Sequence, residues 1–143
     1  MGVMCPCGVK VKAKKKCHNV KFKGVKGTIK GKLTYRADIC VTNLASSTLC
    51  LEFKDKETPN KFSFLFKAIS ITSVKCKKEG QNCVISVKGT GMIGKKVYLF
   101  KAIFIDQIAQ DKVKCFVIKN FFNQNGAVSV PQGSIVALGC QTL

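Results

Sequence analysis

The chain has 143 residues, 46% of them hydrophobic, which is enough for one domain with a core of its own. Its 25 basic residues against 7 acidic ones give a net charge of +18, which predicts a general attraction to polyanions. No apolar run approaches the 18 residues of a spanning helix, so we expect no membrane insertion. The first residues also lack the uninterrupted apolar stretch of a secretory signal peptide.

Apolar residues alternate with polar ones along most of the chain, which is the period of a β-strand rather than of a helix. Clusters of Gly, Pro, Asn and Asp separate these runs and mark turns. The pattern predicts an all-β, single-domain β-sandwich or jelly-roll-like barrel. Strands are expected in residues 9–13, 20–24, 29–41, 49–53, 61–74, 84–88, 97–105, 113–119, 127–130 and 134–138.

The start of the chain is unusually basic, because the first 37 residues contain no Asp or Glu. Val9, Val11 and Ala13 alternate with lysines in a strand that is short and poor in apolar side chains. We therefore expect residues 1–17 to form an extended Cys- and Lys-rich arm, and residues 18–143 to form the β-sandwich domain. The alternative is that this basic segment forms the first strands of the domain itself.

The nine cysteines are an odd number, so they cannot all pair within one chain. Pleat parity places Cys50 opposite Leu49 and Leu51, and Cys40 opposite Ile39, so both should point outward. Parity places Cys83 and Cys115 with apolar neighbours, so burial is expected for them. The candidates for disulfides between subunits are Cys5, Cys7, Cys17, Cys40 and Cys50.

Zinc binding is the alternative for the first cysteines, since Cys5, Cys7, Cys17 and His18 could supply four ligands. Structural zinc sites normally space their cysteines as C-x₂₋₄-C, and the spacing here is tighter. We therefore expect disulfides rather than a metal at these positions, and no cofactor.

Catalysis is not predicted. An activated nucleophile usually needs a neighbouring base, and His18 is the only histidine. The seven acidic residues are scattered, and Asp106 and Asp111 bracket a short loop in which turn hydrogen bonds are expected. The chain is therefore not expected to be an enzyme.

Binding of nucleic acid or another anionic polymer remains open. Lysine clusters neutralise phosphates without reading sequence, and three aromatic residues, Phe22, Tyr35 and Phe66, are candidates for base stacking or for the core. The candidate polyanion-binding lysines are Lys10, Lys12, Lys14, Lys15 and Lys16.

Several segments taken in order carry a family resemblance: residues 31–35, 51–53, 69–74, 87–91, 98–106, 111–118 and 133–135. Between residues 20 and 138 the chain resembles the small β-domain of bacterial multidomain surface proteins called the post-COAP-1 domain. The resemblance implies a β-barrel or sandwich that serves as a structural module without catalytic residues. A Cys-bearing N-terminal extension, carried by Cys5, Cys7 and Cys17, resembles the architecture of bacterial endospore appendage subunits.

The leading hypothesis is a self-assembling structural subunit of a fibre, appendage or coat, located outside the cell or on a spore surface. Its partner would be itself, through arm-to-sheet docking and disulfides between subunits. The alternative is a basic monomeric binder of anionic polymers such as nucleic acid.

Overall fold

The computed structural model describes residues 5–58 and 61–140. Within these residues the chain forms strands and one short 3-10 segment, η1 (Val41–Ser46), which confirms the all-β class. The strands are β1 (Gly8–Phe22), β2 (Ile29–Cys40), β3 (Thr48–Asp55), β4 (Phe64–Glu79), β5 (Asn82–Ile93), β6 (Lys96–Asp106), β7 (Lys112–Ile118), β8 (Phe122–Asn123), β9 (Val128–Ser129) and β10 (Ile135–Leu138).

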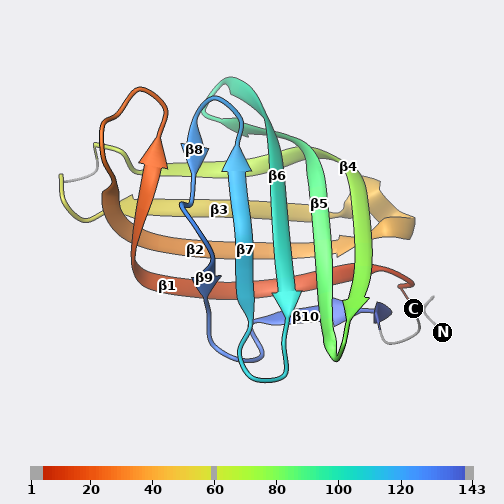
Figure 1. The fold of residues 1–143 in the computed structure, drawn as a ribbon. Helices are drawn as coiled ribbons and strands as arrows, with labels where there is room; N and C mark the ends of the chain where they lie inside the picture. The colour runs from red at the N-terminus through yellow and green to blue at the C-terminus, as the bar shows by residue number, and fades with distance from the viewer. Residues whose placement is uncertain (1–4, 59–60, 141–143) are drawn as a thin grey trace.

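The sheet closes into an eight-stranded antiparallel barrel (Figure 1). Each strand from β1 to β7 pairs with the next one, and β8 returns to β1 where Phe22 lies opposite Phe122. The short strands β9 and β10 add to β7 and β1. In a jelly roll, several neighbouring strands are not consecutive in the chain. The expected barrel is therefore present, but its strands follow one another in sequence rather than in the order of a sandwich or jelly roll.

Residues 8–17, expected as part of an arm, are instead the first part of β1. They pair with β2 from Gly8, opposite Cys40, to Lys15, opposite Leu33. Val9 and Ala13 are buried in the barrel interior. The alternating apolar residues of this segment therefore pack inside the chain's own barrel. Of the described residues in the predicted arm, only residues 5–7 lie outside a strand. Residues 1–4 of that predicted arm lie outside the described residues.

Side chains fill the barrel. Tyr35, Phe53, Phe66, Phe104 and Phe116 are each at most 1% exposed, as expected for a barrel of eight strands. Close packing needs small residues beside these rings. A Cβ atom built on Gly91 of β5 would lie 2.3 Å from Cζ of Phe66, so only glycine fits there.

Four register shifts in the described strand pairs, two of them between β4 and β5, change which side chains face inward. In β1 the register shifts between Lys15 and His18, and in the β6–β7 pair it shifts beside Phe104. A bulge adds one residue to one strand and so reverses the alternation beyond it. Cys115, expected in the core with Val113, is for this reason half-buried, while its neighbour Phe116 is fully buried.

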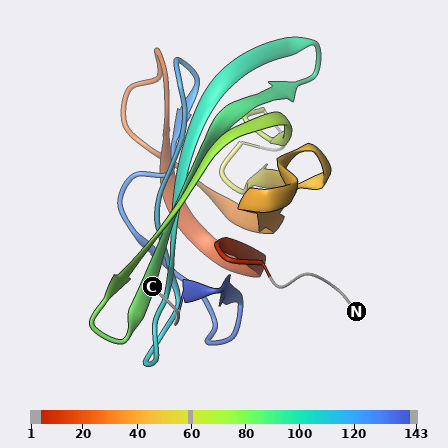
Figure 2. The same cartoon turned by 90° about the vertical axis from the view of Figure 1, so that its right-hand side faces the viewer.

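One end of the barrel gathers segments that are distant in sequence. The turn between β4 and β5, the connection from β6 to β7 and the strand β10 all lie at this end (Figures 1 and 2). The Cys-bearing start of β1 reaches the same region, because Gly8 lies opposite both Cys40 and Leu138.

Candidate functional site: a basic outer face

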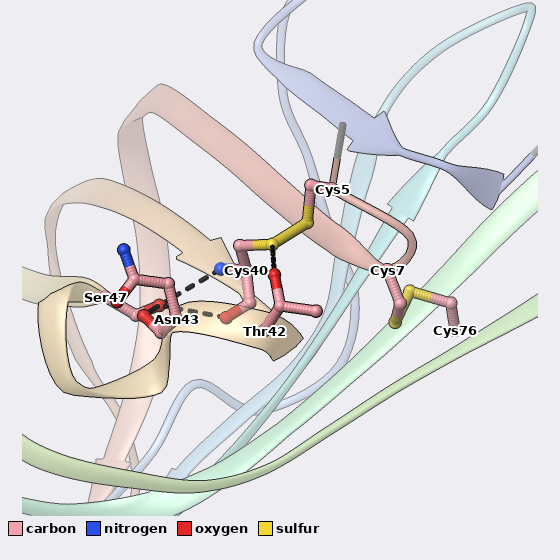
Figure 3. Close-up of a disulfide and its surroundings, with 7 residues drawn as sticks. All are labelled: Cys5, Cys7, Cys40, Thr42, Asn43, Ser47 and Cys76. Atoms are coloured by element: carbon pink, nitrogen blue, oxygen red, sulfur yellow. Dashed lines mark hydrogen bonds between the residues drawn. A yellow bond between two sulfur atoms is a disulfide. The ribbon is translucent and has the colours of Figure 1, made fainter. Parts of the chain in front are cut away.

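Three disulfides fasten this end of the barrel. Cys5 is bonded to Cys40 and Cys7 to Cys76, with Cα–Cα distances of 5.8 Å in both pairs (Figure 3). Cys83 is bonded to Cys140 at a Cα–Cα distance of 6.0 Å. The structure therefore bonds Cys5, Cys7 and Cys40 within one chain, which corrects the expectation that they join subunits. Parity could not find these partners, because pairing depends on which strand ends meet.

The disulfides close loops of 35, 69 and 57 residues. In the chain-entropy model, crosslinks that close loops of this size each stabilise the fold by about 4 kcal/mol. Three bonds within one small domain are compatible with an oxidising environment.

The zinc alternative does not match the geometry of the first cysteines. Cys5 and Cys7 enter different disulfides, and the His18 ring points elsewhere. Its Nε2 atom donates to the carbonyl oxygens of Gln124 and Asn125 at 2.7 and 3.2 Å. His18 therefore holds the segment that follows β8 against β1.

Gln124 is itself fully buried and completes a polar network in the barrel. Its Oε1 atom accepts from the hydroxyl of Tyr35 at 2.7 Å, and its Nε2 atom donates to the carbonyl of Val113 at 2.9 Å. Burial raises the pKa of Tyr35 well above its usual value. The sole histidine and the buried tyrosine thus have structural partners.

Asp111 and Asp106 anchor the C-terminal segment. The fully buried Asp111 accepts from the backbone N–H groups of Gln107, Gly133 and Ile135 at 2.9 to 3.1 Å. Asp106 accepts from the N–H of Ala137 at 2.9 Å. The expected turn hydrogen bond is present between Gln107 and Asp111, and the long-range bonds to the C-terminal segment are an addition that sequence alone did not indicate.

Three thiols among the described residues remain free: Cys17 is exposed, and Cys50 and Cys115 are half-buried. Burial raises the pKa of Cys50, against the opposing effect of Arg36 and Lys67. Burial likewise raises the pKa of Cys115, with Lys101 opposing it. The outward position expected for Cys50 is confirmed by the buried state of its neighbours Leu49 and Leu51.

Cations form a row across the outer face of four neighbouring strands. Lys12 of β1 lies opposite Arg36 of β2, and Arg36 lies opposite Cys50 of β3. Cys50 in turn lies opposite Lys67 of β4. Adjacent strands are about 4.8 Å apart, so the row places three exposed cations within about 15 Å.

Three neighbouring hollows lie along this face. The first, about 510 Å³, lies between the β1 bulge and residues 129–131, and Lys14, Lys15, Lys16 and Cys17 line it. The second, about 260 Å³, shares Lys14 with the first and adds Lys12 and Arg36. The third, about 330 Å³, shares Arg36 with the second and ends at Lys67. We call the six cations that line these hollows the basic track: Lys12, Lys14, Lys15, Lys16, Arg36 and Lys67.

None of the described residues that line the three hollows is acidic. Of the lysines proposed from sequence, Lys10 lies outside the track, because it is opposite Asp38 in the next row. Sequence reasoning missed Arg36 and Lys67. Parity marks both as outward, but the strand register that brings them beside Lys12 and Cys50 is not visible in a single sequence.

The proposed base-stacking residues are all in the core: Phe22, Tyr35 and Phe66 are 7%, 1% and 0% exposed. Among the described residues no helix is long and apolar enough to span a bilayer. Comparison of the chain with protein-family models, with curated proteins and with solved structures finds no match. The resemblances to the post-COAP-1 domain and to spore appendage subunits therefore stay predictions.

Proposed function

We propose that this protein binds anionic polymers by charge, along the basic track on the outer face of its barrel. The observation that carries the proposal is the succession of three neighbouring hollows with no acidic residue among the described residues that line them, in which Lys14 lines the first and second and Arg36 lines the second and third. Five of the six cations are lysines, which act as point charges and suit a repeating anionic backbone more than a specific base edge.

The burial of Phe22, Tyr35 and Phe66 supports recognition of the polymer backbone rather than of bases. The affinity then depends on counterion release. If all six cations engage phosphates of duplex DNA, the logarithm of affinity should fall against the logarithm of salt concentration with a slope of about −5.

The test is fluorescence anisotropy with labelled duplex DNA as a polyanion probe, over a series of salt concentrations. A variant combining Lys12→Gln, Lys14→Gln and Arg36→Gln should bind the DNA at least about tenfold more weakly. The slope of its log affinity against log salt concentration should be less negative by about 3. The matched control combines Lys77→Gln, Lys78→Gln and Lys88→Gln, which removes equal charge from exposed positions outside the track. Equal losses in both variants would show that net charge, and not the track, governs binding.

A second candidate is a self-assembling structural subunit at an extracellular or spore surface. The exposed free thiol of Cys17 favours it, because an exposed thiol is available to a partner chain. Closure of the barrel leaves little free sheet edge for strand addition, so this version of assembly rests on thiol crosslinks. Cys17 alone joins two chains, and a polymer needs a second position, for which Cys50 is the candidate.

Intact mass of oxidised protein without reductant tests this candidate. Linked species that disappear in Cys17→Ser would support it, with Cys115→Ser as the matched control. Monomer alone after oxidation at high protein concentration would rule out covalent assembly through Cys17.

A further inference from the structure

Exposed apolar side chains gather on the outer face of β4, β5 and β6, which lie side by side in the barrel (Figure 1). Leu65 and Ile69 of β4 are 43% and 55% exposed, and Val97 and Leu99 of β6 are 58% and 55% exposed. Half-buried Met92 of β5 lies opposite Val97 and connects the two groups. We call these five residues the apolar patch: Leu65, Ile69, Met92, Val97 and Leu99.

The patch includes a hollow. Leu65, Ile69 and Met92 line a shallow depression of about 570 Å³ together with Lys67. Four of the six large apolar side chains that are exposed among the described residues belong to this one surface. Clustering of this kind marks an interaction surface, whereas scattered single exposures need no explanation.

Lysines border the patch on most sides, and the one carboxylate beside it among the described residues is Glu52 of β3, which lies opposite Leu65. Lys67 lies opposite Met92, and Lys95 and Lys96 lie in or beside the turn between β5 and β6. The backbone N–H of Lys119 donates to the carbonyl of Leu99 on the far side. All four lysines are exposed, and no Asp or Glu occurs in the sequence between Glu79 and Asp106.

This charge distribution indicates which kind of partner the apolar patch would bind. A second copy of the chain would bring two lysine rims and two net charges of +18 together, which opposes self-association. An anionic bilayer surface offers both complements, since its headgroups attract lysines and its acyl boundary receives apolar side chains.

We propose that the apolar patch docks on an anionic lipid bilayer, with Val97, Leu99 and Leu65 entering the interface and Lys67, Lys95 and Lys96 contacting headgroups. The barrel lies on the surface and does not cross it. The proposal does not rest on polymer binding, because Lys67 is the one cation of the track that also lines the depression of the patch, and the other four track lysines and Arg36 lie on β1 and β2.

The test is flotation of the folded, oxidised protein with phosphatidylcholine vesicles that do or do not contain phosphatidylglycerol. We expect binding to the anionic vesicles. A variant combining Val97→Thr and Leu99→Thr should reduce the partition coefficient at least about tenfold, and Lys95→Gln with Lys96→Gln should reduce it severalfold. Threonine keeps the strand preference, and Ile108→Thr, at a 64% exposed loop position, is the matched control.

Two results would overturn the proposal. If the Val97→Thr and Leu99→Thr variant binds anionic vesicles as well as the Ile108→Thr control does, adsorption is by net charge alone. If wild-type protein fails to float with anionic vesicles, the patch does not dock on lipid. In that case, a dimer that sedimentation detects in the wild type but not in the Val97→Thr and Leu99→Thr variant would assign the patch to self-association. Circular dichroism and thermal unfolding of each variant establish that the fold is kept.

Discussion

Lys67 of β4 lies directly opposite Met92 of β5, and this pair joins the basic track to the apolar patch. Lys67 lines both the last hollow of the track and the depression of the patch. Lys67 thus lies where the basic track across β1 to β4 meets the apolar patch of β4 to β6.

Variants at this shared position and at one position in each surface separate the two proposals. Lys67→Gln should weaken binding both to duplex DNA and to anionic vesicles, each by a few-fold. Lys14→Gln should weaken DNA binding alone, and Lys96→Gln should weaken vesicle binding alone, because each lies in one surface only. Anisotropy and flotation on the same three proteins provide the comparison; identical profiles for all three would contradict two distinct surfaces.

The disulfide between Cys7 and Cys76 should contribute strongly to stability. It closes a 69-residue loop and joins the segment before β1 to β4. Replacing both residues by Ser should lower the free energy of unfolding by about 4 kcal/mol, within a usual range of about 2–5 kcal/mol. Urea unfolding measures the loss. Cys17→Ser removes an exposed free thiol and should leave the midpoint nearly unchanged; a similar loss in that control would exclude the crosslink as the cause.

Asp106 should make stability depend on pH. Burial raises the pKa of this carboxyl, the N–H of Ala137 opposes the rise, and the charge and hydrogen bond of Asp111 add to it. The folded state therefore holds the proton more tightly than the unfolded state. The contribution of Asp106 to the free energy of unfolding is full below the unfolded pKa of about 3.9. This contribution is lost as pH rises through the raised pKa of the folded state.

Asp106→Asn mimics the protonated side chain and keeps an acceptor for Ala137. The variant should lack this fall in stability with rising pH and should equal or exceed the wild type at neutral pH. Urea midpoints measured at steps from pH 3 to pH 7 on both proteins check the prediction. A wild-type stability that only rises across this range, in parallel with the variant, would contradict it.

Gly91 should not tolerate a larger residue. A Cβ atom there would lie 2.3 Å from Cζ and 2.6 Å from Cε1 of Phe66, and Phe66 is fully buried. Gly91→Ala should destabilise the barrel by about 1–3 kcal/mol through overpacking. Phe66→Leu in the same chain should recover part of the loss. Additive effects in this double-mutant cycle would show that the ring is not the obstacle.

Local alternation was sufficient to predict the class of structure and the inward residues of most strands. Leu49, Leu51 and Phe53 were expected on one face, and all three are buried. The alternation depends only on the pleat, which places successive side chains on opposite faces wherever a strand forms. The two-residue strand β8 was not predicted, because so short a segment has no period.

Pairing and closure were decided by the tertiary structure. The sequence of residues 8–17 determines a strand but not its partner, and β2 and β10 take the place that was expected for a neighbouring subunit. The pairing of Cys5 with Cys40 depends on the same docking. The register that aligns Lys12, Arg36 and Lys67 depends on contacts between residues far apart in the chain. In the β6–β7 pair a bulge shifts the register by one residue and changes the face on which Cys115 lies. Composition therefore determined that the surface is basic, while only the meeting of β1 to β4 in a closed barrel placed those charges side by side.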